Sequence, residues 1–266
     1  MRRMVAVLAM LVPLILNAQT DVMSLIRQGK LSEAWEYLHS EINSGNISFE
    51  NLEMFGNVTF EISEGKKPKN EIMGFLDKAM PVLEKNAFQQ SFTKIEQARI
   101  FHKYNTLFAK KAQIQGAAAA LKVLPQVFDN ADRCIALDPD FAEPYFVKAS
   151  VDDEVPAFLG DVAKRGENAK YRMGINIELA LERDPENIYF LVQAAAALVK
   201  RNWSVEMREK NVGNATQKNR ILLLSDKEEA KRLLERAVSA YNSKANPTPI
   251  EKAKYEQALK LQAKLR

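Results

Sequence analysis

Cys-Ile-Ala-Leu-Asp-Pro at residues 134–139 and Ala-Leu-Glu-Arg-Asp-Pro at residues 180–185 are two versions of one pattern. In each of them an apolar helical segment runs into an Asp-Pro dipeptide, and another apolar helical segment follows it. Stretches that alternate apolar and polar residues, as half-buried strands do, are nearly absent from the chain. The repeated pattern therefore predicts an all-helical fold made of short helices joined into hairpins.

The Asp-Pro dipeptides are predicted to start the helices that follow them. Aspartate accepts hydrogen bonds from the free N–H groups of a first helical turn, and proline has no N–H to lose there. Three Ser/Thr-x-x-Glu pairs predict further helix starts, at residues 93–96, 225–228 and 248–251. The residues given the helix-starting role at the dipeptides are Asp138 with Pro139 and Asp184 with Pro185.

Small residues placed before and within these segments resemble those of the tetratricopeptide repeat family, in which they allow neighbouring helices to approach closely. Gly-Lys-Leu-Ser-Glu-Ala at 29–34 and Ser-Asp-Lys-Glu-Glu-Ala at 225–230 have the same form. The resemblance implies an α-α superhelix, a solenoid of antiparallel helix pairs. The residues that it assigns to close helix contacts are Ala34, Cys134, Ala180, Ala230 and Ala237.

The repeats are degenerate. Pro139 and Pro185 lie 46 residues apart, whereas the family's period is about 34. Two insertions are expected, at 151–171 and 201–224, and insertions in helical repeats usually emerge on one face. The resemblance covers about 130–250 and 22–45, while the helical stretch between them is not readable as a repeat.

The first insertion contains Phe-Leu-Gly-Asp at 158–161, which resembles the tetratricopeptide proteins associated with tripartite ATP-independent periplasmic transporters. That resemblance implies a substrate-binding subunit or a small anionic ligand as partner. The chain departs from it in two ways. It has Leu159-Gly160 where these proteins commonly have Gly-Gly, and it has no cysteine near the leader to carry a lipid.

Residues 1–18 have the form of a secretory signal peptide, with a basic start, a short apolar run and Ala18 at a cleavage point. We expect an exported protein, in the periplasm of a Gram-negative-type bacterium or secreted, with no transmembrane segment in the mature chain. An uncleaved N-terminal anchor is the alternative. Residues 19–266 are expected to form one tetratricopeptide-like domain, with N-terminal helices at 19–125 and clearer repeats at 126–266.

No motif in the sequence predicts catalysis, a metal site or a cofactor. The two histidines, His39 and His102, are far apart in the chain and are expected to have no catalytic role. The acidic run at 152–154, near Asp161, could form an acid–base pair, but a solvated cluster is the stronger interpretation. Cys134, the single cysteine, is expected to fill a buried site rather than to react. We therefore expect a protein that is not an enzyme.

A basic segment at 200–220 holds six basic side chains against two acidic ones. The full sequence has a net charge of only +4, and an exported protein would not meet nucleic acid. The segment therefore favours another envelope protein or peptide, a transporter subunit or a small anion. A solvated segment without a binding role is the alternative. Charge reversal at Arg201 and Arg208 is expected to weaken partner binding without changing thermal stability. The residues predicted to contact a partner are Arg201, Trp203, Arg208 and Lys210.

Overall fold

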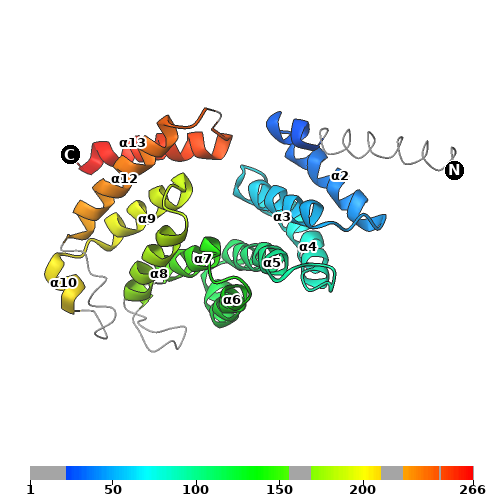
Figure 1. The fold of residues 1–266 in the computed structure, drawn as a ribbon, viewed down its shortest axis with the longest axis horizontal. Helices are drawn as coiled ribbons and strands as arrows, with labels where there is room; N and C mark the ends of the chain where they lie inside the picture. Colours follow the sequence, from blue (N-terminus) through cyan, green and yellow to red (C-terminus); the bar gives the residue numbers. More distant parts are fainter. Residues whose placement is uncertain (1–21, 156–168, 211–223, 246, 266) are drawn as a thin grey trace. The chain divides into compact units, whose positions relative to one another are not determined.

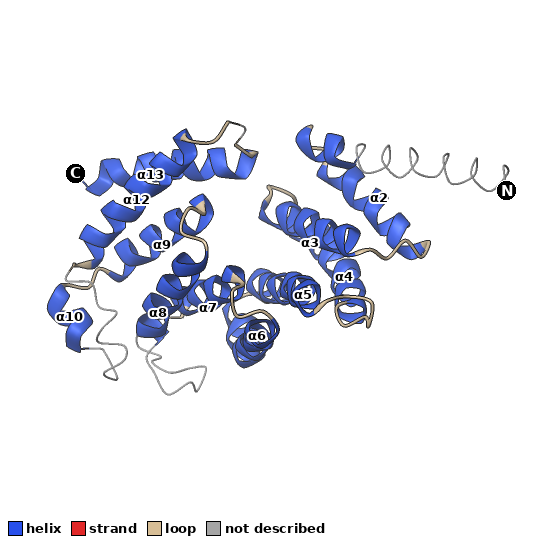
Figure 2. Cartoon of the chain, viewed as in Figure 1, coloured by secondary structure: helices blue, strands red, loops and turns tan. Residues whose placement is uncertain are grey.

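The computed structural model describes residues 22–155, 169–210, 224–245 and 247–265, and most of them are helical (Figure 1, Figure 2). No strand occurs within these ranges, so the predicted all-α fold is confirmed for this part of the chain. None of the described helices combines the length and the apolar character that crossing a membrane would require. The leader at 1–18 lies outside the described residues.

The chain divides into two compact units between Ala117 and Ala118. Residue 126, where the clearer repeats were predicted to begin, lies inside the helix at Ala117–Leu137. Unit 1 contains α2 (Leu31–Asn43), α3 (Phe49–Glu64), α4 (Lys69–Asn86) and α5 (Lys94–Gln115). Unit 2 contains α6 (Ala117–Leu137) from its second residue onward, α7 (Ala142–Glu154), α8 (Ala169–Arg183), α9 (Ile188–Arg201), α10 (Val205–Lys210), α12 (Asp226–Asn242) and α13 (Pro249–Leu265).

Unit 2 is built from antiparallel pairs, α7 with α8 and α9 with α12. At one end of the first pair, Arg183 Nε of α8 donates a hydrogen bond at 2.7 Å to the carbonyl of Pro139, just before α7. Arg236 Nη2 of α12 makes the equivalent bond, at 2.6 Å, to the carbonyl of Pro185, just before α9. We name this the turn end. The opposite end, where the chain passes from α7 to α8 and from α9 to α12, is the loop end.

Successive pairs in unit 2 stack by one rule. Helix α9 packs against both α7 and α8, and α13 packs against both α9 and α12 (Figure 1). Each pair of helices is therefore covered by the next helix in the stack. That helix is the first of the following pair or, at the end of the unit, the single helix α13. This is the tetratricopeptide-like packing that the sequence pattern predicted.

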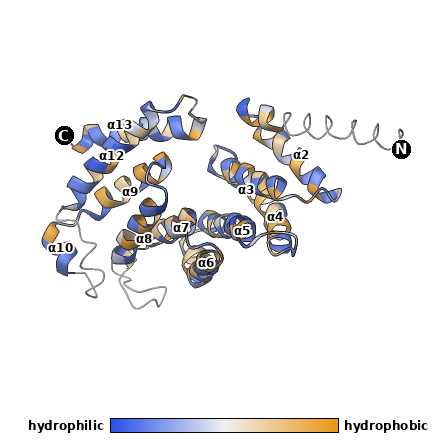
Figure 3. Cartoon of the chain, viewed as in Figure 1, coloured by the Kyte–Doolittle hydropathy of each residue, from blue (hydrophilic) through white to orange (hydrophobic). Residues whose placement is uncertain are grey.

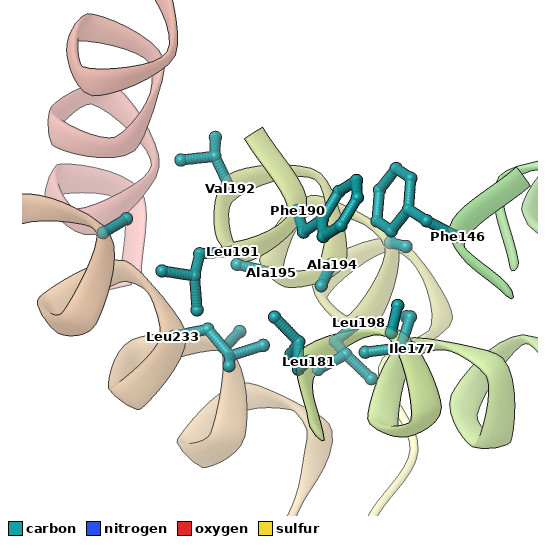
Figure 4. Close-up of a cluster of buried hydrophobic side chains, with 14 of the residues drawn as sticks. Phe146, Ile177, Leu181, Phe190, Leu191, Val192, Ala194, Ala195, Leu198 and Leu233 are labelled. Atoms are coloured by element: carbon teal, nitrogen blue, oxygen red, sulfur yellow. The ribbon is translucent and has the colours of Figure 1, made fainter. Parts of the chain in front are cut away.

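The core of unit 2 lies between these stacked helices. Phe146 of α7 stacks on Phe190 of α9 at a centroid distance of 4.4 Å, and Leu233 of α12 lies on the other side of α9 (Figure 4). Each of these helices carries both apolar and polar positions (Figure 3). Small side chains at these contacts let the backbones approach closely. All five small residues that the sequence assigned to close contacts are fully buried: Ala34, Cys134, Ala180, Ala230 and Ala237.

The prediction that the Asp-Pro dipeptides start helices is wrong. Helix α7 begins at Ala142, three residues after Pro139, and Asp138 Oδ1 accepts the Asp140 backbone N–H at 3.2 Å. At the second junction Asn187 caps α9 and also donates to the Asp184 side chain at 2.9 Å. The aspartates therefore hold turns between helices, because a short polar side chain satisfies nearby backbone groups as readily in a turn as at a cap.

The three Ser/Thr-x-x-Glu helix starts are confirmed. In each, the hydroxyl accepts the glutamate N–H, and the glutamate carboxylate accepts the N–H of the hydroxyl residue. These reciprocal bonds satisfy two donors that would otherwise have no partner in the first turn. The capped helices are α5, α12 and α13.

Unit 1 follows the stacking rule where the sequence showed no repeat. Helix α5 packs against both α3 and α4. Helices α3 and α5 run parallel, because Glu53 meets Arg99 near their starts and Glu64 meets Lys110 near their ends. They approach so closely that a Cβ at Gly56 would lie 2.6 Å from Lys103 Cβ. A larger residue at this crossing would require Lys103 to move, so the contact depends on a glycine that no local pattern in the sequence predicts.

Candidate interaction site at the loop end

The loop end of unit 2 concentrates charged side chains, most of which are buried. They come from the last turns of α7 and α9, the first turns of α8 and α12, and α10. We name these residues the loop-end cluster: Asp152, Asp153, Lys170, Arg172, Lys200, Arg201, Arg208, Asp226 and Glu229. Both connections from the first to the second helix of a pair begin and end beside this cluster.

Asp152 in α7 is fully buried and pairs with Arg172 in α8. Arg172 Nη2 donates to Asp152 Oδ1 at 2.7 Å, and Arg172 Nε donates to Oδ2 at 3.2 Å. The guanidinium also lies 5.5 Å from the centre of the Phe128 ring of α6. This fork joins the two helices of the first pair and fixes the point where α8 begins.

Lys170 in α8 closes the end of α7. Its ammonium donates to the carbonyl of Asp152 at 3.3 Å and to the carbonyl of Asp153. The last carbonyls of a helix have no partner within the helix, so these bonds satisfy groups that would otherwise be buried and unpaired. Lys200 in α9 reaches the same turn and donates to Asp153 Oδ2 at 3.2 Å, which ties the second pair to the first.

Arg201 and Asp226 form the corresponding pair between α9 and α12. Arg201 Nη2 and Nε donate to the two carboxylate oxygens of Asp226 at 2.7 Å and 2.8 Å. The backbone N–H of Trp203 donates to the same carboxylate at 2.8 Å, and the guanidinium lies 4.4 Å from the Trp203 ring centre. Arg201 Nη1 donates to the carbonyl of Lys170 at 2.7 Å. One side chain therefore contacts both helix pairs.

Arg208 anchors the short helix α10 to α12. Its Nε donates to Asp226 Oδ1 at 2.6 Å, another nitrogen bonds Glu229, and a third donates to the carbonyl of Leu224 at 3.1 Å. Met207 and Lys210 on the same helix are exposed. The buried arginine thus positions a helix on which four of the other five residues are exposed.

The two buried carboxylates have opposite pKa shifts. Burial raises the pKa of Asp152 to about 6, because the loss of water outweighs the hydrogen bonds and charge of Arg172. Burial acts on Asp226 in the same sense, but Arg201, the Trp203 N–H and Arg208 outweigh it and hold its pKa below the usual value. Ionisation therefore costs free energy at Asp152 and is favoured at Asp226.

The residues predicted to contact a partner lie together here, but they differ in exposure. The side chains of Arg201 and Arg208 are only 5% and 8% exposed and are paired within the chain, whereas Trp203 is half-buried and Lys210 is exposed. The expectation that charge reversal at the two arginines would spare stability is therefore corrected. Reversal would place like charges against Asp226 inside the fold.

Sequence reasoning missed the acidic halves of these pairs. The run at 152–154 was interpreted as solvated, yet Asp152 is fully buried. Only Glu154 in that run is largely exposed, while Asp161 lies outside the described residues. Arg172, an arginine on the apolar face of its helix, was the available signal for a buried partner.

Of the remaining candidates for chemistry, Cys134 and His102 are buried and His39 is partly exposed. Cys134 is fully buried, and burial raises the pKa of its thiol to about 12, as expected of an unreactive filler. Burial holds the pKa of His102 well below its usual value, and the His39 ring stacks on Trp35 at 4.7 Å. Among the described residues, no group of three His, Cys, Asp or Glu side chains is placed to hold a metal ion.

Comparisons with known proteins name no relative by sequence. No family model matches the chain, and no curated protein matches it. Among solved structures, the crystal structure of MamA protein is similar over 87% of this chain and 96% of that chain, with 13% sequence identity and a TM-score of 0.42. A TM-score this low supports no argument. The fold assignment therefore depends on how this chain's own helices pack.

Proposed function

We propose that this chain is a non-catalytic scaffold for protein–protein interaction, and that its partner binds at the loop end of unit 2. One observation carries the proposal. The connections in two successive helix pairs have their ends held in a single buried polar cluster, and Arg201 bonds to both pairs. In helical repeat proteins such connections often form the binding face.

The composition of the cluster supports a role in positioning rather than in stability. Buried ion pairs are often no more stabilising than well-packed apolar residues of similar volume, because each charge loses its water. Elsewhere in unit 2 the same helices are joined by Phe, Leu and Ala side chains. Among the described residues of unit 2, the ion pairs that are buried on both sides lie at the loop end, which fits a need for fixed geometry there, as a binding surface requires.

Helix α10 is the part of this end that we assign to the partner. Arg208 fixes it from inside, and Met207 is 44% exposed beside the exposed Lys210. An exposed methionine next to charged side chains is common at interfaces that adapt to a protein surface. The predicted partner residues Trp203 and Lys210 keep that role in this proposal, while Arg201 and Arg208 hold them in place.

Photo-crosslinking in the native cell tests whether the partner binds at α10. A crosslinking amino acid replaces Met207 in one variant and Leu259 of α13, which is 42% exposed, in a control variant. We expect a specific adduct from position 207 and none from 259. The captured protein should then bind the purified chain, and Lys210→Glu should weaken that binding. Equal adducts from both positions would contradict the assignment of the site.

The leader supports a further part of the proposal, that the chain is exported and meets its partner in the cell envelope. A phosphatase that is active only outside the cytoplasm, fused after residue 25, tests this. Activity is expected with residues 1–18 present and should be lost when they are deleted. An active fusion without them would contradict export by this leader.

A second candidate function is an accessory subunit of a periplasmic solute-uptake system. The Phe-Leu-Gly-Asp segment at 158–161 favours it. Under this alternative the protein captured at position 207 is a solute-binding subunit, or the purified chain binds a small organic anion in calorimetry. If position 207 instead captures an envelope protein that is not a transporter subunit, and calorimetry shows no heat of anion binding, the general scaffold is the better description.

A further inference from the structure

We propose that a continuous chain of buried polar contacts couples the two loop-end connections, so that loosening the end of one loosens the end of the other. The chain of contacts runs through five helices of unit 2. This proposal is independent of the partner proposal, because it concerns coupling within the chain itself and needs no bound partner.

The first half of the chain of contacts crosses the first helix pair. Lys170 holds the last carbonyls of α7 through its ammonium. The backbone carbonyl of the same residue accepts Arg201 Nη1 of α9 at 2.7 Å. A displacement of the first turn of α8 therefore moves a group bonded to α7 and a group bonded to α9 together.

The second half crosses the second pair. The remaining nitrogens of Arg201 hold Asp226 of α12, and Asp226 in turn holds Arg208 of α10. These side chains are all at least nine-tenths buried. Water therefore has little access to replace a lost bond, and breaking one contact leaves its neighbour unsatisfied.

Gly174 marks the point where the two halves meet. A Cβ at this position would lie 2.8 Å from Arg201 Nη1, which is closer than a Cβ atom comes to a neighbouring atom in proteins. The guanidinium therefore occupies the space that a side chain on α8 would fill. Gly174→Ala should push the Arg201 side chain away from the Lys170 carbonyl while leaving the charges unchanged.

The test is amide hydrogen exchange on the full chain, with Arg208→Met at the far end of the chain of contacts. We expect exchange to rise about threefold or more in the first turn of α12, and also in the distant last turn of α7 and first turn of α8. Lys210→Met, on the same helix but exposed, is the matched control and should change neither end. Faster exchange confined to α10 and α12 would overturn the proposal.

Arg208→Met could unfold the whole unit, and faster exchange at the turn end would reveal this. Two further variants then test the coupling. Coupling is reciprocal, so Lys170→Met should accelerate exchange in the first turn of α12. Gly174→Ala should accelerate exchange in the first turns of both α8 and α12. A response at only one of these turns would overturn the coupling.

Discussion

Asp152 and Asp226 occupy the same end of two consecutive helix pairs, but the placement of charge around them is reversed. In the α7–α8 pair the acid lies in the last turn of the first helix, and its arginine lies in the first turn of the second. In the α9–α12 pair the arginine ends the first helix and the acid begins the second. Helix dipoles favour cations at the C-terminal end and anions at the N-terminal end, so only the second pair agrees with them.

The number of hydrogen-bond donors to the carboxylate also favours the charged form of Asp226 over that of Asp152. Among the described residues, the Asp226 carboxylate receives two guanidiniums and the Trp203 N–H, while the Asp152 carboxylate receives the guanidinium of Arg172. Both carboxylates are fully buried, yet the pKa rises at one and falls at the other. Burial sets the cost of a charge, and the donors around it decide whether that cost is offset.

The largest effect is expected from Asp226→Asn. The change removes the charge that Arg201 and Arg208 share and leaves two cations buried without it. We expect a loss of about 3–5 kcal/mol in the free energy of unfolding, measured by urea denaturation at pH 7. Glu235→Gln on the exposed face of the same helix is the control and should change stability by less than about 0.5 kcal/mol. A loss below about 1 kcal/mol would mean that Asp226 does not hold the cluster.

The second effect is a pH dependence that belongs to Asp152. Its folded pKa is about 6, against 3.8 for the ordinary side chain, so the folded state binds the proton more tightly. The free energy of unfolding should therefore fall, by up to about 3 kcal/mol, as pH rises from about 4 to about 7. Asp226 has the opposite shift, so its contribution is lost only as pH falls below the ordinary value.

Denaturation of the wild type and of Asp152→Asn at pH 4.5 and pH 7 separates this effect from other titrations. Glu61 in unit 1, whose pKa burial also raises, contributes equally to both proteins and cancels. We expect the wild type to lose more stability over this interval than the variant. The same pH slope in both would show that Arg172 offsets the burial of Asp152.

The third effect is the direct cost of Asp152→Asn at pH 7. The variant leaves Arg172 without its counter-ion, but it also removes a carboxylate whose ionisation is unfavourable. We expect a loss of about 1–2 kcal/mol, smaller than that of Asp226→Asn. Thermal unfolding of both variants in one buffer compares their losses of stability. If Asp152→Asn were the more damaging, the contrast between the two pairs would be wrong.

The sequence predicted the helices of unit 2 better than the ends of those helices. The apolar periodicity of a helix and the small residues within it can be recognised from residues close together in the sequence. The helix pairs of unit 2 could therefore be inferred from them. The Asp-Pro junctions were assigned to helix starts because a turn and a cap use the same residues. Whether Asp138 bonds to a turn or to a helix depends on where α7 begins, which tertiary packing decides.

The candidate site could be located from the sequence but not understood from it. The excess of basic residues at 200–220 pointed to a segment whose Arg201 and Arg208 lie in the loop-end cluster, and its role in binding a partner stays a prediction. The excess did not reveal that Arg201 and Arg208 point inward, because their partner Asp226 begins a helix more than 15 residues later. Pairings across an insertion leave no local pattern. The repeat rule in unit 1 was hidden for a related reason, since Gly56 serves a contact with a helix more than 40 residues away.

The smallest effect is expected from Lys200→Ala, although this lysine also links the two helix pairs. Its side chain is 54% exposed, and its ammonium donates to Asp153 Oδ2 at 3.2 Å. Water and salt screen an exposed pair, so we expect the free energy of unfolding to change by less than about 0.5 kcal/mol, and by still less in 0.5 M salt. A loss above about 1 kcal/mol would mean that contacts between pairs, rather than the buried arginines within them, hold the loop end together. The difference between Asp152 and Asp226 would then matter less than the bridge at Asp153.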